Sequence, residues 1–320
     1  MPVFHAITID DIRAAADLIR PHVIRTPVIT APLIDDMLNA ELFFKCENLQ
    51  HVGAFKTRGA CNAVFSLSHE EAAAGVVAHS SGNHAAALAR AAKLRGIVAH
   101  IVMPHNSAAV KIEAVRSYGV EPTFCEPDAE SRQAVADRVI AETGATFIHP
   151  FNNAHVMAGQ GTAALEMLEQ ADNLDAIVVP VGGGGLLSGT LVAVTALSPN
   201  VPVFAAEPAW ADDAYRSFRS GKIEAPQRYD TMADGLRTLL GTLTFPIIRD
   251  LTKDVLLASE DSIRTATAAI LKQARVVAEP SGAVPLAAIM EHSDLFKEKR
   301  VGVIISGGNM DPALLAELVK

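Results

Sequence analysis

Cysteine is scarce in this sequence, and long apolar runs and a leader pattern are missing. The three cysteines, Cys46, Cys61 and Cys125, are odd in number and lack CxxC spacing, which argues against a disulfide framework and against a zinc site. The longest apolar tract, GLLSGTLVAVTAL, is too short and too interrupted to span a bilayer. The amino-terminal stretch interleaves apolar residues with Asp and Arg, unlike a cleavable signal. We therefore expect a cytoplasmic protein.

Positive charge is also in short supply. Lysine and arginine number 27 against 36 acidic residues, which gives a formal net charge of -9. Binding to nucleic acid or to an anionic membrane needs a concentrated Lys/Arg surface, so we expect neither partner. Hydrophobic residues make up 50% of the chain and charged residues 20%. This balance is typical of a globular enzyme and excludes a disordered chain.

Short β-branched runs alternate with alanine-rich helical segments along the chain. The runs are GVVAHS, AHIVMP, EPTFCE, TFIHP, DAIVVPV, VPVFAAEP, DVLLAS and VGVIIS. This order predicts an α/β fold in which helices cover both faces of parallel sheets, and ligands bind at the carboxyl ends of such strands. Residues 75–150 contain three or four of these units. We predict that they form a small domain inserted into a larger one made of residues 1–74 and 151–320.

The strongest local motif is VVPVGGGGLLSGT, residues 178–190. Four consecutive glycines between a strand and a helix let backbone N–H groups converge on an anion at the helix amino terminus, so the motif predicts a phosphate site. A P-loop is unsupported because no GxxxxGK[ST] is present. A dinucleotide loop is disfavoured, since Leu187 and Ser188 stand where its last glycine belongs. The alternative is a tight turn that binds nothing.

Two more polar turns follow apolar strands. In IISGGNMD, residues 304–311, Ser306 either presents its hydroxyl to a ring nitrogen or caps the following helix. In AHSSGNHAAALA, residues 78–89, the polar side chains Ser80, Ser81 and Asn83 are also good helix caps. Three turns of this type in one α/β chain indicate a shared polar pocket.

Lys56 stands in AFKTRGA, between Phe55 and the start of a mostly apolar helix. Its side chain either extends to solvent along the apolar surface or is desolvated. Desolvation lowers the pKa of a lysine and makes the amine a nucleophile toward an aldehyde. An internal amine, a phosphate site and a hydroxyl for a ring nitrogen together describe a site for pyridoxal phosphate.

Four motifs, AFKTRGA, HSSGNHAAALA, VGGGGLLSG and SGGN, resemble in order and separation those of the serine/threonine dehydratase and serine racemase family of pyridoxal-phosphate enzymes. The stretches CEPDAESR, MAGQGTAALE, AAEPAWADDAY and MADGL resemble its branch of serine racemases and hydroxyaspartate dehydratases. The resemblance covers almost the whole chain. It implies a tryptophan-synthase-β-like fold with two parallel-sheet domains, pyridoxal 5'-phosphate as the cofactor, and a homodimer.

The resemblance also implies roles for individual residues. Lys56 would hold the cofactor covalently and later remove the substrate α-proton. The other cofactor-binding residues would be Phe55 against the ring, Asn83 on the ring hydroxyl, Gly182, Gly183, Gly184 and Gly185 on the phosphate, and Ser306 on the ring nitrogen. Ser81 would face the substrate α-carbon from the side opposite Lys56, and the substrate carboxylate would meet Ser80, Asn83 and His84.

Two further groups concern a cation and the substrate side chain. EPAWADD resembles the family's divalent-cation site, with Glu207, Asp213 and the carbonyl of Ala211 as ligands for Mg²⁺, Mn²⁺ or Ca²⁺. The alternative is a solvated acidic turn. Positive charge for a second substrate carboxylate would come from Arg132, His155 or Arg237, each of which also has a structural interpretation.

The expected activity is that of an ammonia-lyase. A hydroxyl partner on the ring nitrogen carries no charge to stabilise a pyridinium, which favours prompt loss of a β-substituent. We therefore expect dehydration of L-serine, L-threonine or 3-hydroxyaspartate to a 2-oxo acid and ammonia. The alternatives are serine racemisation, which Ser81 would assist, and β-replacement with a second nucleophilic substrate.

Overall fold

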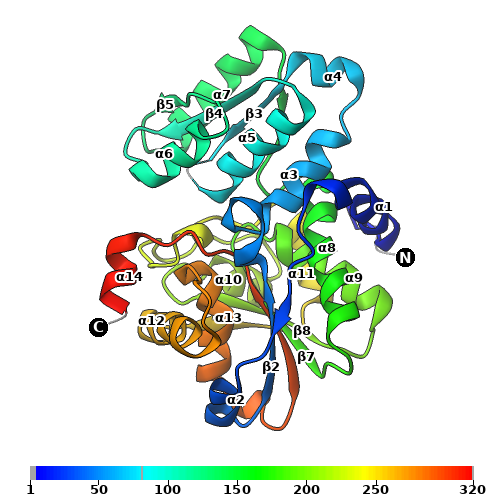
Figure 1. Cartoon of the computed structure of the whole chain (residues 1–320), viewed down its shortest axis with the longest axis vertical. Helices are drawn as coiled ribbons and strands as arrows, with labels where there is room; N and C mark the ends of the chain where they lie inside the picture. Colours follow the sequence, from blue (N-terminus) through cyan, green and yellow to red (C-terminus); the bar gives the residue numbers. More distant parts are fainter. Residues whose placement is uncertain (1–4, 81, 319–320) are drawn as a thin grey trace.

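The computed structural model describes residues 5–80 and 82–318, whose strands form two sheets stacked along the long axis (Figure 1). The larger sheet has the order β1-β2-β10-β7-β8-β9 within these residues. Its strands are β1 (Val28–Ile29), β2 (Glu41–Cys46), β7 (Ala176–Pro180), β8 (Val203–Pro208), β9 (Asp254–Ala258) and β10 (Arg300–Ile305). β1 pairs antiparallel with β2 at one edge, and the other neighbouring pairs in the register are parallel.

The smaller sheet has the order β5-β4-β3-β6, and its strands are parallel. They are β3 (Val76–His79), β4 (Ala99–Pro104), β5 (Thr123–Cys125) and β6 (Thr146–Phe147). The predicted α/β class with parallel sheets is confirmed, and each β-branched run of the sequence contains one of these strands or one of β7 to β10. The sequence patterns did not predict β1 or β2.

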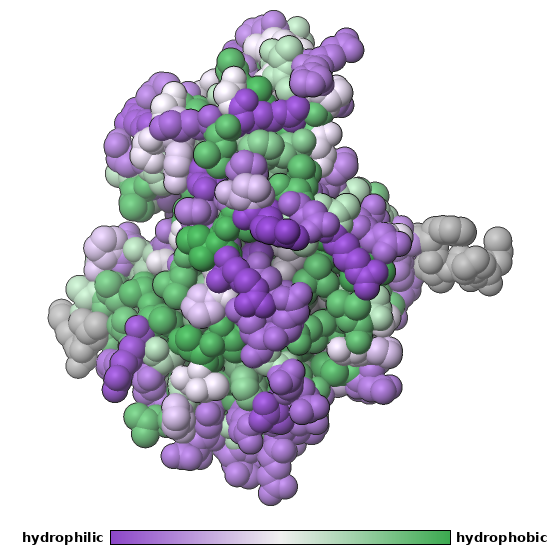
Figure 2. All heavy atoms as spheres, turned by 45° about the vertical axis from the view of Figure 1, so that its right-hand side comes forward, coloured by the Kyte–Doolittle hydropathy of each residue, from purple (hydrophilic) through white to green (hydrophobic). Residues whose placement is uncertain are grey.

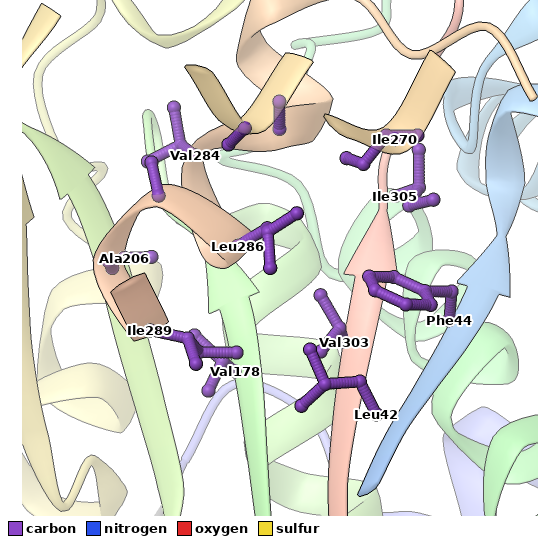
Figure 3. Close-up of a cluster of buried hydrophobic side chains, with 14 of the residues drawn as sticks. Leu42, Phe44, Val178, Ala206, Ile270, Val284, Leu286, Ile289, Val303 and Ile305 are labelled. Carbon is purple, nitrogen blue, oxygen red and sulfur yellow. The ribbon is translucent and has the colours of Figure 1, made fainter. Parts of the chain in front are cut away.

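Helices cover both faces of the larger sheet (Figure 1). The helices of this layer are α1 (Ile9–Ile19), α2 (Pro32–Leu38), α8 (Ala154–Gln170), α9 (Gly185–Leu197), α10 (Asp213–Ser220), α11 (Thr244–Leu251), α12 (Glu260–Ala269), α13 (Pro280–Glu291) and α14 (Pro312–Leu318), which packs on α12. One apolar cluster joins α13, α12 and α2 to the sheet, and a second joins α8, α9, α11 and α1. In Figure 3, Leu286 and Ile289 of α13 lie over Val178 and Val303 of the central strands.

Short turns of helix connect these elements. They are η1 (Arg20–His22), η2 (Glu47–Leu49), η3 (His51–Gly53), η4 (Asp234–Leu236), η6 (Ser293–Leu295) and a π-helical turn, η5 (Ile270–Ala274). Local sequence explains several helix ends. Ser68 and Glu71 form a capping box at the start of α4 (His69–Ala74), and Gly96 ends α5 (Asn83–Arg95) in the left-handed conformation, with φ 72°.

The smaller sheet packs against α3 (Lys56–Phe65), α4 (His69–Ala74), α5 (Asn83–Arg95), α6 (Ala109–Arg116) and α7 (Ala129–Thr143). Its main apolar cluster includes Ala60 and Val64 of α3 and Ile19 of α1, which precede residue 75 in the chain. Helix α3 also packs against α8 beside the larger sheet. It therefore contacts both layers, and the division at residues 74 and 150 stays a prediction.

Two glycines bring α3 and α8 into backbone contact. A Cβ atom on Gly159 of α8 would lie 2.7 Å from the carbonyl oxygen of Arg58, and one on Gly59 of α3 would lie 2.7 Å from that of Val156. Cβ atoms do not approach backbone oxygens so closely, so these positions need glycine. The contact fixes the start of α3 relative to the larger sheet.

Hydrophilic side chains cover most of the lower end of the molecule, and hydrophobic ones are exposed near the waist between the two layers (Figure 2). Among the described residues, no helix combines the length and the hydropathy needed to cross a membrane.

Candidate active site

Lys56 is the first residue of α3, a helix that lies at the junction of the two layers (Figure 1). Its Nζ donates a hydrogen bond of 2.9 Å to the carbonyl oxygen of Pro150 and lies 5.0 Å from the centre of the Phe55 ring. Burial lowers the pKa of Lys56 to about 8, against the opposing influence of the Glu279 carboxyl group. The side chain is half-buried, and its amine is hydrogen-bonded within the protein.

The four-glycine loop connects β7 to the start of α9. Gly182, Gly183, Gly184 and Gly185 are all buried, and Gly184 has φ 89°, a conformation that favours glycine. A Cβ atom on Gly183 would lie 2.3 Å from the Phe151 ring. No backbone hydrogen bond in the described part of the chain uses the N–H groups of these glycines. Buried, unused donors at a helix amino terminus fit a bound phosphate.

The loop is held from its other side by α11. Thr244 Oγ1 donates a hydrogen bond of 2.8 Å to the carbonyl oxygen of Gly183, and Gly241 N–H donates to Thr244 Oγ1 at 2.9 Å. Asn152 Oδ1 accepts from Leu243 N–H at 2.7 Å. The carbonyl oxygen of Gly183 is thus engaged by Thr244, whereas the N–H groups of the loop have no backbone partner among the described residues.

The SGGN turn lies beside Lys56. Ala54 and Gly307 form an antiparallel bridge, and Phe55 N–H donates to the carbonyl oxygen of Ser306 at 3.0 Å. Ser306 is 3% exposed, so its hydroxyl is withdrawn from solvent. The second polar turn of the sequence is thereby placed against the lysine.

Asn83, the first residue of α5, brings the third turn into the same place. Its Nδ2 donates to Glu279 Oε1 at 2.8 Å, and its Oδ1 accepts from Asn309 Nδ2 at 2.8 Å. Asn309 Nδ2 also donates to the carbonyl oxygen of Val52 at 2.7 Å. The three predicted turns therefore converge around Lys56.

Two histidines close to Lys56 are held neutral. Burial, the largest cause, and the charge of Lys56 lower the pKa of His84 to about 3, while its Nε2 lies 3.0 Å from the carbonyl oxygen of Ile148. Burial and His79 lower the pKa of His149 to about 4. His149 Nδ1 accepts from Asn152 N–H at 2.9 Å and from Phe151 N–H at 3.3 Å.

The remaining predicted substrate residues lie in different surroundings. Ser80 Oγ accepts from Gly82 N–H at 3.3 Å at the entrance of α5, and Ser81 lies outside the described residues. Arg132 on α7 lies near His79, whose pKa its charge helps to lower after the larger effect of burial. The roles of Ser80, Ser81 and Arg132 in substrate binding stay predictions.

Within residues 5–80 and 82–318, no hydrogen bond or ion pair joins His155 or Arg237 to Lys56. His155 is exposed in the first turn of α8, and its backbone carbonyl accepts from Asn62 Nδ2 at 2.7 Å. Arg237 Nε donates to the carbonyl oxygen of Thr231 at 2.9 Å. Both roles in substrate binding stay predictions.

Glu207, Ala211 and Asp213 lie together at the end of β8 and the start of α10, and all three are buried. Burial and the charge of Asp213 raise the pKa of Glu207 well above its ordinary value, and burial raises the pKa of Asp213 to about 7. Asp213 Oδ1 is buried without a hydrogen-bond partner among the described residues. This cluster is not a solvated acidic turn.

A buried ion network anchors the other side of α3. Arg58 donates to Glu47 Oε2 at 2.7 Å and to Glu166 Oε1 at 2.8 Å. Lys45 Nζ donates to Glu166 Oε2 at 2.5 Å and to the carbonyl oxygen of Thr26 at 2.7 Å. Lys45, Glu47 and Arg58 are fully buried, and each charge has a partner of opposite sign, as burial requires.

Several residues of the site were not predicted from the sequence. Pro150, Phe151 and His149 come from the segment after β6, and Glu279 from the turn before α13. Glu279 directly precedes Pro280, which looks like an ordinary acidic helix start. The buried position of its carboxylate depends on contacts between distant segments.

Comparison with known proteins agrees with this geometry. Residues 19–307 match the model of the family described as pyridoxal-phosphate dependent enzyme. The chain belongs to this family. It is 49% identical to the β-hydroxyaspartate dehydratase of Paracoccus denitrificans, over 95% of this chain and 96% of that protein. It is 47% identical to the serine racemase of Dictyostelium discoideum, over 98% of each chain.

The solved structure of maize serine racemase has the same fold. Its TM-score is 0.95 at 46% identity, and the match covers 98% of this chain and 97% of that one. The recognised family and its branch of serine racemases and hydroxyaspartate dehydratases are thus confirmed, and so is the fold class.

Proposed function

We propose that the protein is a pyridoxal-phosphate-dependent ammonia-lyase that converts a β-hydroxy amino acid to a 2-oxo acid and ammonia. The candidate substrates are L-serine, L-threonine and 3-hydroxyaspartate. The observation that carries the proposal is the Lys56 amine, which is hydrogen-bonded within the protein and whose pKa burial lowers to about 8. The similarity to a β-hydroxyaspartate dehydratase at 49% identity supports it.

The residues present fit the cofactor. Lys56 would bind it covalently, the N–H groups of Gly182–Gly185 would hold its phosphate, and Asn83 and Ser306 would meet its ring. When bound, the cofactor supplies a conjugated ring that takes up the electron pair left by the α-proton. The amino-terminal end of α5 offers Ser80 and backbone N–H groups to the substrate carboxylate.

Lys56 is the base that removes the α-proton at Nζ, because its neutral form is accessible near neutral pH. The Pro150 carbonyl, 2.9 Å from Nζ, orients the amine. The substrate loses this proton and its β-hydroxyl as water. Hydrolysis of the released enamine consumes one water and frees ammonia and the 2-oxo acid.

The test is an ammonia-release assay over both isomers of serine and of threonine and both 3-hydroxyaspartate diastereomers. We expect ammonia and a 2-oxo acid in equal amounts from at least one of them, without an added thiol. Release that requires a thiol would instead indicate a β-replacement synthase. No release from any of the substrates would reject the ammonia-lyase.

Serine racemisation is the second candidate, and the 47% identity to a serine racemase favours it. In that case D-serine accumulates from L-serine faster than ammonia does. Ser81→Ala would then suppress racemisation more than elimination from the L-isomer. Equal loss of both would remove the special role of Ser81.

We further propose that Glu207, Asp213 and the Ala211 carbonyl bind a divalent cation. The unpartnered Oδ1 of Asp213 and two buried carboxylates call for positive charge, and oxygen ligands suit Mg²⁺, Mn²⁺ or Ca²⁺. No cluster of three or more His, Cys, Asp or Glu side chains at metal-binding separation occurs in residues 5–80 and 82–318. Carbonyl and water oxygens would complete the shell.

A homodimer is part of the proposal. Sedimentation equilibrium of the cofactor-loaded protein tests it, and a mass that stays at 33.8 kDa across the concentration range would reject it.

A further inference from the structure

Glu279 lies at the amino terminus of α13 but does not cap that helix. It occupies the N-cap position before Pro280, and its side chain makes no capping hydrogen bond. A helix amino terminus attracts acidic side chains, so the orientation of this one is unusual. It reaches instead to Asn83, whose Nδ2 lies 2.8 Å from Oε1. The residue is 6% exposed, so its carboxyl group is withdrawn from water and faces the pocket.

The SGGN turn makes room for this pair. A Cβ atom on Gly307 would lie 2.3 Å from Glu279 Oε1 and 3.2 Å from Asn83 Nδ2. The carbonyl oxygen of Gly307 accepts from Glu279 N–H at 3.0 Å. Glycine at this position therefore permits the approach of the carboxylate to Asn83.

The contacts of Asn83 fix the orientation of its amide group. Asn83 Nδ2 donates to Glu279 Oε1 at 2.8 Å, so the nitrogen of the amide faces Glu279. The oxygen of Asn83 accepts from Asn309 Nδ2 at 2.8 Å. A primary amide nitrogen carries two hydrogens, and Glu279 uses one of them. The other N–H is available to an oxygen acceptor in the pocket.

Charged groups from three elements surround Glu279. Lys56 follows Phe55, whose N–H donates to the carbonyl oxygen of Ser306, the residue before the Gly307 that adjoins Glu279. The Glu279 carboxyl opposes the effect of burial on the pKa of Lys56. Asp234 of η4 and Lys111 of α6 form an ion pair nearby. Burial raises the pKa of Glu279 to about 7, with Asp234 adding to the rise and Lys111 opposing it. The carboxylate is thus placed to balance a positive charge at the lysine nitrogen.

We propose that Glu279 is a positioning residue of the cofactor site, which directs the free N–H of Asn83 to an oxygen of the bound cofactor and provides the counter-charge for the Lys56 nitrogen. The inference rests on the cofactor-binding part of the proposed function and is independent of which substrate is used.

The test uses the cofactor-loaded protein without substrate. The visible absorbance of the cofactor attached to Lys56 depends on protonation of the linking nitrogen, and its pH midpoint is measured. In Glu279→Gln the midpoint should fall by about 1 pH unit, since an opposite charge this close favours protonation. Glu279→Asp keeps the charge and should restore the midpoint toward the native value.

The matched control is Glu291→Gln at the other end of α13, which removes a carboxylate that accepts from Ser259 N–H at 3.0 Å, outside the site. Its midpoint should equal that of the unchanged protein. An unchanged midpoint in a Glu279→Gln protein that retains its cofactor would overturn the proposal.

Asn83→Ala provides a second test that does not need Glu279→Gln to fold. The dissociation constant of the cofactor should rise about tenfold when the directed N–H is lost, and an unchanged constant would overturn the proposal. Both measurements are made without substrate. If the protein proves not to be an ammonia-lyase, the role proposed for Glu279 therefore still stands. If these two measurements reject that role, the assigned reaction still stands.

Discussion

At the scale of a single residue, Lys56 acts as a nucleophile and a base only in its neutral form. An ordinary lysine has a pKa of about 10.4, so fewer than one in a thousand is neutral at pH 7. Burial lowers the pKa of Lys56 to about 8, which makes about one in ten neutral. Its bond to Pro150, 2.9 Å long, holds the amine in place in either state.

The pH dependence of cofactor capture follows from this pKa. Only the neutral amine attacks an aldehyde. The rate at which the cofactor-free protein binds pyridoxal phosphate should therefore rise with pH, reach half its limit near pH 8 and level off by about pH 9, as the pKa of about 8 requires. Stopped-flow absorbance measures the rate, and N-acetyl-lysine amide is the free-amine control. A rate that still climbs steeply above pH 9 would contradict the desolvated amine.

Removal of the amine tests the assignment directly. Lys56→Ala should lower turnover by about 10³-fold or more, because both the covalent anchor and the base are lost. After borohydride reduction, intact mass spectrometry should show the added cofactor on Lys56 in the native protein and no addition in the variant. Lys253→Ala, at the exposed surface, is the control. A modified lysine elsewhere would contradict the assignment.

Residues of the site differ in how far the sequence predicted them. Lys56, Asn83 and the four glycines stand in local motifs whose chemistry is legible without a fold. Glu279 and Pro150 act through contacts with segments far away in the chain, Asn83 and Lys56 respectively. No local pattern distinguishes such residues, because their burial arises only when the two layers come together.

Close approach of α3 and α8 is the decisive feature at the scale of elements. Gly159→Ala should lower the free energy of unfolding by about 1–3 kcal/mol, since its Cβ would meet the backbone of Arg58 and Gly59 at 2.7 Å. Urea titration measures the change. Gly82→Ala, where no atom lies within 4 Å of the added carbon, is the control and should change stability by less than about 0.5 kcal/mol. An equal loss of stability in Gly159→Ala and Gly82→Ala would contradict the close packing of α3 against α8.

The strands show why some elements were predicted and others were not. The eight that were predicted are apolar, β-branched runs bounded by turn residues. In β2, ELFFKC, Glu41 and Lys45 are charged. Lys45 is nonetheless fully buried, because Glu166 and the carbonyl oxygen of Thr26 accept hydrogen bonds from its ammonium group. The sequence pattern places a charged residue such as Lys45 at the surface. Hydrogen bonds to residues distant in the chain allow Lys45 to be buried, and the sequence does not reveal them.

Acid should weaken the folded protein as a whole through its neutral histidines. The pKa of His149 is about 4 in the fold against 6.5 when unperturbed, so the unfolded chain binds more protons between these values. Stability is full above pH 6.5 and falls as the pH drops toward 4. His149→Asn retains an acceptor but does not titrate. Between pH 7 and 5, its free energy of unfolding in urea titrations should fall by less than that of the native protein, the difference being on the order of 1 kcal/mol. Parallel losses would contradict this.

The proposed cation should also act on the whole molecule. Magnesium, manganese or calcium should raise the melting temperature, because a ligand that binds only the folded state stabilises it. Chelation should reverse the rise. Asp213→Asn should abolish the response, whereas Asp172→Asn, at the exposed end of another loop, should retain it. If neither an added cation nor chelation changes the melting temperature of the native protein, the cation site is rejected.

The two layers are joined at the site itself. Asn83 from the smaller layer meets Glu279 from the larger, and Lys111 meets Asp234 in the same way. The sequence predicted two parallel sheets, which the structure has. Their boundary stays a prediction, because α3 packs its apolar side into the core of the smaller sheet.

The ion network behind α3 limits how this enzyme can be engineered. Replacing Arg58 alone leaves Glu47 and Glu166 without its guanidinium group. This change should lower the free energy of unfolding by about 3–5 kcal/mol. Replacing Lys45, Glu47, Arg58 and Glu166 together with apolar side chains of similar volume removes every desolvated charge at once, and such exchanges are often neutral or favourable. Libraries that vary these four positions one at a time would therefore miss the improved variants, which require concerted change.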